Sequence, residues 1–204
     1  MTDRSQPQFL FDFGSPNAYM AHKVIPGIEA RAGAKFEYVP VLLGGIFKLT
    51  GNKPPMVAFG GIKGKMDYEM LETRRFIARH GLDKFQFNPN FPVNTLALMR
   101  MATAARMAGT LPAYADAVFH HMWEAPKKMD DPEVMRAALL ESGLDADALT
   151  AAAQTHEVKQ ALMNATEDAV SRGTFGIPTF FVGGEIFFGK NTLPEVEAEI
   201  FKTK

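Results

Sequence analysis

The chain has 204 residues, of which 47% are hydrophobic and 22% are charged, a balance that supports a folded core and excludes a disordered protein. Its 22 Lys and Arg residues nearly cancel its 23 Asp and Glu residues, so charge favours neither nucleic acid nor a charged membrane surface as a partner. Cysteine is absent, which excludes a protein dithiol, a thiolate nucleophile and a cysteine-ligated metal. The first residues lack an apolar signal region and no apolar run is long enough to span a bilayer, so we expect a cytoplasmic protein.

The first expected element is a short buried strand over residues 9–13, where apolar and aromatic residues follow one another. Gly14 ends this strand, and Ser15 followed by Pro16 is typical of an N-cap and the first helical position. The Ser15 hydroxyl would then lie at the positive end of a helix dipole, a position that suits an anion or a thiolate. The alternative interpretation is that Ser15 only caps a helix.

The helix that begins at Pro16 is expected to run to about residue 31, and Gly33 closes it. Residues 35–41 alternate and are rich in aromatic and β-branched types, which predicts a second strand parallel to the first. Residues 42–55 are predicted to form a short helix or loop. The glycine-rich, basic residues 59–65 are predicted to form a mobile linker.

From residue 65 to Gly173 the pattern is helical, and Gly81, Gly109 and the Asp131-Pro132 pair mark where helices end or begin. The methionines and aromatic residues of this stretch are interpreted as core, because a stripe at helical spacing is more often packing than a cofactor site.

After Gly173 the pattern returns to sheet. Residues 179–182 and 185–188 form two strands around the turn Gly183-Gly184, and a capping box at residues 192–195 begins the last helix. The order β-α-β, a helical stretch and β-β-α is typical of an α/β thioredoxin-like domain with a large all-α insertion. We assign residues 1–62 and 174–204 to the thioredoxin-like domain and residues 63–173 to the insertion.

In an open α/β sheet, ligands bind beyond the carboxyl ends of the strands, which is where the Ser15 turn lies. Pro178 immediately precedes a strand, at the place where a thioredoxin-like fold carries a cis proline facing that turn. Ile177 would then offer its backbone N–H and C=O to a peptide-like ligand.

Four segments carry a more specific resemblance: residues 11–16, 50–55, 91–94 and 175–179. With these segments the chain resembles the 2-hydroxychromene-2-carboxylate isomerases and the kappa-class glutathione transferases. The resemblance implies a DsbA-like thioredoxin fold, a homodimer and glutathione as cofactor. It also implies that Ser15 replaces the cysteine of the thiol–disulfide oxidoreductases of this fold, so that the reactive sulfur comes from glutathione.

Residue by residue, the resemblance gives Ser15 and Asn52 catalytic roles. Ser15 Oγ would donate a hydrogen bond to the glutathione sulfur and, with the helix dipole, favour the thiolate. Asn52 would hydrogen-bond the ligand near the sulfur or the reacting substrate.

The remaining cofactor-binding residues implied by the resemblance surround these two. Ile177, before Pro178, would pair with the cysteinyl backbone of glutathione, and Pro16 and Asn17 lie beside Ser15 in the first helical turn. Lys190 and Asn191 occupy the loop that holds the γ-glutamyl end in the family, where relatives usually carry a serine or asparagine followed by an aspartate.

The function that follows is a glutathione-dependent isomerase of aromatic catabolism that interconverts 2-hydroxychromene-2-carboxylate and trans-o-hydroxybenzylidenepyruvate. A thiolate that adds to the conjugated system makes a double bond single, and elimination after rotation returns the thiolate. One alternative is a kappa-like glutathione transferase or peroxidase acting on another electrophile. Another is a fold relative that binds a peptide or small thiol without chemistry, an alternative kept open by Lys190 and Asn191.

Other residues carry weaker signals. Asp12 lies in an apolar strand, and we interpret it as a carboxylate satisfied by backbone donors rather than as a catalytic acid. Adjacent His120 and His121 would point apart on a helix, so no metal site is expected. Tyr19 and Trp123 are read as core rather than as the lining of a pocket for the small aromatic substrate.

Overall fold

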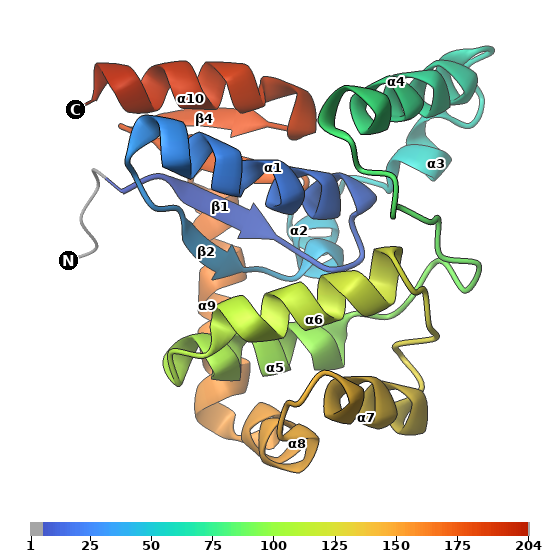
Figure 1. Ribbon diagram of the computed structural model, residues 1–204, viewed down its shortest axis with the longest axis vertical. Helices are drawn as coiled ribbons and strands as arrows, with labels where there is room; N and C mark the ends of the chain where they lie inside the picture. Colours follow the sequence, from blue (N-terminus) through green and yellow to red (C-terminus); the bar gives the residue numbers. More distant parts are fainter. Residues whose placement is uncertain (1–5, 204) are drawn as a thin grey trace.

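A computed structural model describes residues 6–203 (Figure 1). Both ends of the predicted thioredoxin-like domain, residues 1–5 and residue 204, lie outside the described residues, as does most of the N-terminal stretch searched for a signal region. Within residues 6–203, none of the helices is long and apolar enough to cross a membrane.

A four-stranded sheet forms the centre of the fold, in the order β2-β1-β3-β4. Strand β1 (Gln8–Phe11) pairs in parallel with β2 (Glu37–Pro40), with Phe9 opposite Tyr38. It pairs antiparallel with β3 (Thr179–Val182), which in turn pairs antiparallel with β4 (Glu185–Phe188). The parallel β1–β2 pair confirms the expected strand-helix-strand unit, and the sheet is mixed because the second half of the chain returns as a hairpin.

Helices surround this sheet and account for most of the chain (Figure 1). The helices are α1 (Pro16–Ala32), α2 (Leu43–Thr50), α3 (Pro55–Phe59), α4 (Lys65–His80), α5 (Leu96–Met107), α6 (Leu111–Trp123), α7 (Pro132–Glu141), α8 (Ala146–Gln154), α9 (His156–Ser171), the short 3-10 helix η1 (Lys190–Thr192) and α10 (Leu193–Lys202). Helices α1 and α10 lie together on one face of the sheet, and α9 passes behind the other face (Figure 1). The predicted α/β thioredoxin-like class with a large helical insertion is confirmed.

The core runs without interruption from the sheet into the inserted helices. Phe9 stacks on Phe180 of the neighbouring strand, with ring centroids 5.4 Å apart. Phe13, just after β1, meets Phe119 of α6 edge to face at 4.8 Å. Such aromatic pairs each contribute about 0.5–1.5 kcal/mol beyond the burial of their area. Hydrophobic packing therefore joins the two parts of the chain that the sequence assigned to separate domains.

Two local expectations are wrong. Thr192 does not cap α10 through its side chain, because its backbone (φ −87°, ψ 4°) is not in the extended conformation that an N-cap residue normally adopts. Its hydroxyl instead donates to the carbonyl oxygen of Gly189 at 2.9 Å. On α4, Met70 is 50% exposed whereas Phe76 is 2% exposed, so the interpretation of the methionines as core is wrong for Met70. Of the expected linker at residues 59–65, the first residue belongs to α3 and the last belongs to α4, so residues 60–64 connect the two helices.

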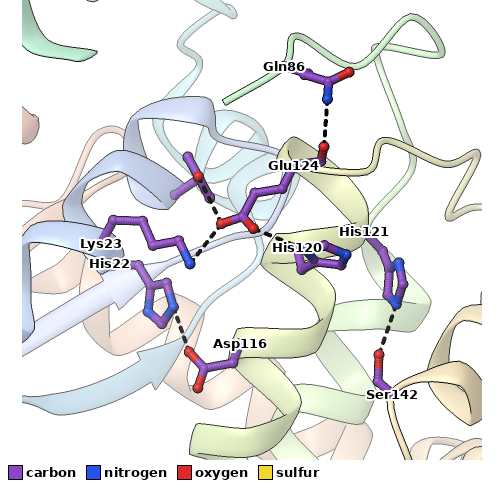
Figure 2. Close-up of polar contacts among 9 residues, drawn as sticks. His22, Lys23, Gln86, Asp116, His120, His121, Glu124 and Ser142 are labelled. Carbon is purple, nitrogen blue, oxygen red and sulfur yellow. Dashed lines mark hydrogen bonds and ion pairs between the residues drawn. The ribbon is translucent and has the colours of Figure 1, made fainter. Parts of the chain in front are cut away.

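A buried carboxylate, Glu124, joins α1 to the C-terminal end of α6. Figure 2 shows Lys23 and His120 pointing toward it. Its oxygens accept hydrogen bonds from the Tyr19 hydroxyl at 3.0 Å, the Lys23 ammonium at 2.7 Å and the His120 ring nitrogen at 3.0 Å. Burial alone raises the pKa of Glu124, but hydrogen bonds from Lys23 and His120 and the Lys23 charge outweigh it and hold the pKa at about 2. The ionised form is therefore the one that the fold stabilises.

A second polar contact extends the same interface. The His22 ring lies between Asp116 of α6, with 2.9 Å between Nε2 and Oδ1, and the Tyr38 hydroxyl of β2 at 3.0 Å (Figure 2). The hydrogen bond from His22 lowers the pKa of Asp116. Polar contacts thus fix α1 against α6 along two successive residues, His22 and Lys23.

Replacing Glu124 by Gln should lower the free energy of unfolding by about 2 kcal/mol at pH 7, because an amide cannot accept three donors and carries no charge for Lys23. The pKa of Glu124 is depressed in the folded state, so its contribution is complete above its ordinary pKa of 4.5 and is lost as pH falls toward 2. We expect the difference in unfolding free energy between the native protein and Glu124→Gln to be smaller at pH 3 than at pH 7. Denaturant unfolding at the two pH values measures it. Glu141→Gln, which removes an exposed partner of Lys127, serves as the control and should change stability little.

Candidate active site

The Ser15 turn lies where β1 meets α1. Ser15 adopts an extended backbone (φ −98°, ψ 113°), and its Oγ accepts the Ala18 N–H at 3.2 Å, which is the predicted N-cap. The same hydroxyl donates to the carbonyl oxygen of Ile177 at 3.1 Å. The side chain thus joins the positive end of α1 to the segment before β3, and its capping role accounts for only one of its two bonds.

Asp12 lies beneath this turn and is fully buried. Its two carboxylate oxygens accept the N–H groups of Gly14 and Leu43, each at 2.8 Å, and the Thr95 side chain adds a further hydrogen bond. Burial raises the pKa of Asp12, and the bonds from Leu43, Gly14 and Thr95 counter only part of that rise. The expectation of a carboxylate satisfied by backbone donors is confirmed, and its role is to hold the turn that carries Ser15.

Ile177 and Pro178 face the turn from the other end of the chain. Their peptide bond is cis, as expected, and both side chains are buried. The Pro178 carbonyl accepts the Gly189 N–H at 2.9 Å, which anchors the loop after β4. Among residues 6–203, the Ile177 N–H has no hydrogen-bond partner, and the Ile177 carbonyl has only Ser15. One backbone donor and one replaceable acceptor therefore lie side by side next to the Ser15 hydroxyl.

Lys190 follows in the loop after β4 and is 4% exposed. Its ammonium makes an ion pair with Glu72 of α4 and lies 5.2 Å from the centroid of the Phe76 ring. The loop is therefore attached to α4, and the positive charge of Lys190 is neutralised within the protein. Sequence reasoning missed Glu72, because one acid among the many charged residues of α4 carries no signal for a buried partner.

The other predicted site residues are more exposed. Pro16 and Asn17 form the half-exposed first turn of α1, beside Ser15. Asn52 is exposed in the loop between α2 and α3, where its N–H donates to the Thr50 hydroxyl at 3.3 Å. Asn191 is exposed in η1. No hydrogen bond found in residues 6–203 joins Asn52 or Asn191 to Ser15, so their roles stay predictions.

Tyr19 and Trp123 are core residues, as interpreted from the sequence, each at most 1% exposed. The Trp123 indole N–H donates to the carbonyl oxygen of Phe13 at 2.9 Å, two residues before Ser15. The rings of His120 and His121 turn to different partners, Glu124 and Ser142 (Figure 2). The aromatic residues near the turn thus support it from below.

Comparison with known proteins assigns the family. A family model described as a DSBA-like thioredoxin domain matches residues 8–201. The chain belongs to this family. Among curated members, 2-hydroxychromene-2-carboxylate isomerase of Sphingobium xenophagum is 28% identical over 192 residues, covering 93% of this chain and 95% of that one. Human glutathione S-transferase kappa 1 is 23% identical over 181 residues, covering 84% and 78% of the two chains.

A solved structure of a 2-hydroxychromene-2-carboxylate isomerase superposes on this DSBA-like chain with a TM-score of 0.81 at 24% identity. The superposition covers 96% of this chain and 94% of the other. At this identity the likeness establishes the fold. The curated relatives, which are isomerases and glutathione transferases, establish that the chain is related to enzymes.

Replacing Glu72 by Gln should lower the free energy of unfolding by about 3 kcal/mol, because the buried Lys190 ammonium loses its counter-charge. Adding Lys190→Met to Glu72→Gln should recover most of that loss, since the unpaired charge is then removed as well. Denaturant unfolding of the single and double variants measures both effects.

Glu69→Gln on the same helix is the matched control, because its ion pair with Lys65 is half-exposed and should contribute less than about 1 kcal/mol. Equal losses from Glu72→Gln and Glu69→Gln would show that the Lys190 pair does not stabilise the loop.

Proposed function

We propose that the protein is a glutathione-dependent isomerase that interconverts 2-hydroxychromene-2-carboxylate and trans-o-hydroxybenzylidenepyruvate. The observation that carries the proposal is the Ser15 hydroxyl, which caps α1 and lies 3.1 Å from the Ile177 carbonyl oxygen in a chain without cysteine. Two kinds of relative support the proposal. One is named 2-hydroxychromene-2-carboxylate isomerase and matches this chain over nearly its whole length, and the other is named glutathione S-transferase kappa 1.

The backbone beside Ser15 fits a peptide-like cofactor. Glutathione contains a cysteinyl residue with its own N–H and C=O, and Ile177 offers one group of each kind. A ligand N–H that takes the Ile177 carbonyl would displace the Ser15 proton from it. The hydroxyl has one proton to donate, so this exchange would free it to turn toward the ligand sulfur while its oxygen still accepts the Ala18 N–H.

The site also favours negative charge. Ser15 lies at the N-terminus of a 17-residue helix whose unpaired N–H groups and dipole stabilise anions. A hydrogen bond donated to a thiolate and the positive end of a dipole both lower a thiol pKa. With Lys190 neutralised by Glu72, the nearby loop presents no free ammonium from that residue to the γ-glutamyl end.

When bound, glutathione would supply a thiolate able to add reversibly to a conjugated double bond, so that rotation becomes possible about the bond that was double. The chain's own residues would do three things. Ser15 would hold the sulfur as an anion, Ile177 would fix the cofactor backbone, and Asn52 would donate to the oxygen on which negative charge develops. The substrate would be a small aromatic carboxylate.

A kappa-like glutathione transferase is the second candidate, favoured by the relatives that carry that name. It would use the same Ser15 and differ in the electrophile. Turnover of a generic aryl halide or hydroperoxide, with none of the chromene, would favour this candidate over the isomerase. Glutathione binding without turnover of any of these substrates would indicate a relative that only binds.

The proposal includes the homodimer that the family resemblance implies. Sedimentation velocity of the purified chain should give a mass of two copies of the 22.5 kDa chain. A sedimenting species of one copy at working concentrations would contradict this part alone.

Ser15→Gly should lower isomerase turnover by about a hundredfold, because it removes a hydrogen bond to a developing or full negative charge. Gly is preferred to Ala because it retains most of the N-cap preference, so the loss is not caused by unfolding of α1. The thiolate absorbance of bound glutathione, followed against pH, should show a pKa below the ordinary thiol value of about 8.5 for the native protein and a value closer to it for Ser15→Gly.

Ser171→Ala provides the control, since this exposed hydroxyl lies in the last turn of α9 and, within residues 6–203, its only hydrogen bond is to the carbonyl of Asp168. Unchanged turnover in Ser15→Gly, together with no thiolate signal in the native protein, would reject the proposed role of Ser15.

A further inference from the structure

A concave site lies between α2, α5 and α9, and we call it the α2–α5–α9 groove. It encloses about 390 Å³, and its apolar wall includes Leu49, Leu162 and Met163. This volume falls within the range of small-molecule sites, about 300–1,000 Å³. None of the residues of the Ser15 site lines it. The groove is therefore a separate place on the molecule.

The apolar side chains of the groove are partly uncovered. Leu162 forms its buried base at 3% exposure, whereas Leu49 and Met163 at its edge are 51% and 47% exposed. Its apolar side chains are aliphatic or thioether, and the one ring in the lining is the exposed imidazole of His156. Such a surface offers mainly van der Waals contact and adapts its shape through methionine, without a phenyl or indole face for stacking.

Three cations, Lys48, Arg100 and Lys159, converge on this apolar surface from the three helices. Within residues 6–203 none of the three makes an ion pair or a side-chain hydrogen bond, so their charges are available to a ligand. Glu167 is the one acidic residue of the lining, and it too has no cationic partner in that range. The groove thus carries a net positive charge above an apolar floor.

From this combination we propose that the α2–α5–α9 groove binds an alkyl carboxylate of medium chain length. The cations would hold the carboxylate, with the Arg100 guanidinium able to make two parallel hydrogen bonds to it. The alkyl chain would lie along Leu49, Leu162 and Met163 and remove their exposed surface from water. The apolar floor offers no phenyl or indole ring on which an aromatic ligand could stack, and a neutral alcohol would leave the cations unsatisfied. The inference is independent of the proposed function.

Isothermal titration of the full chain with decanoate tests the proposal. We expect one site per chain, an affinity that rises about fourfold for each methylene from hexanoate to decanoate, and weaker binding as salt increases. Arg100→Gln and Lys48→Gln should each weaken decanoate binding by about tenfold. Because neither side chain has a structural partner, their melting temperatures should stay unchanged.

Two matched variants control for charge in general. Lys84→Gln removes an exposed lysine outside the groove and should leave decanoate affinity unchanged. Glu167→Gln removes the acid of the lining and should strengthen binding two- to threefold. In a methionine-methyl NMR spectrum, the signal that is missing from Met163→Leu identifies the Met163 methyl group. In the native protein this signal should shift when decanoate is added.

Three results would overturn the proposal. They are equal binding of 1-decanol and decanoate, an unchanged affinity in Arg100→Gln and Lys48→Gln, and displacement of decanoate by glutathione. The last result would indicate that decanoate binds at the Ser15 site and not in the groove, and it would leave the proposed role of Ser15 untouched.

Discussion

One hydroxyl group connects the two ends of this chain. Ser15 Oγ completes the first turn of α1 and reaches the carbonyl of Ile177, a residue 162 positions later in the sequence. Neither partner is replaceable by packing alone, because a helix terminus and a non-strand carbonyl both need polar partners when they are buried. These two hydrogen bonds therefore hold the β1–α1 turn next to the cis proline and the beginning of β3. The candidate active site lies where these three segments meet.

The inserted helices support this place more than they enclose it. Glu124 at the end of α6 gathers donors from Tyr19 and Lys23 of α1. Trp123, one residue earlier, holds the carbonyl of Phe13. These contacts attach the insertion to the first helix and to the strand end that flank Ser15. Together with the continuous core, they join the two sides of the predicted domain boundary, a division that itself stays a prediction.

Local chemistry made much of the site predictable. A serine before a proline after an apolar strand specifies a capped helix, and a proline before a strand late in the chain marks the facing segment, so Ser15 and Pro178 could be placed together from the order of elements. Asp12 could be interpreted because a carboxylate among apolar residues needs backbone donors.

What the sequence did not predict are contacts decided by tertiary packing. Lys190 and Glu72 are 118 residues apart, and each looks like an ordinary surface charge. Met70 and Phe76 lie on one helix, and which of them is buried depends on the direction from which the rest of the chain approaches. Thr192 had the right neighbours for a capping box, but η1 directly precedes α10 and leaves Thr192 with ψ near 4°, outside the extended region of an N-cap residue.

The indole of Trp123 gives this molecule a built-in optical probe. It is the single tryptophan of the chain, it is wholly buried, and its N–H is hydrogen-bonded to the backbone two residues before Ser15. Emission from the unlabelled protein therefore originates at one point beneath the candidate active site. Changes in its wavelength or intensity read out the environment of that turn, without the averaging over several sites that most proteins impose.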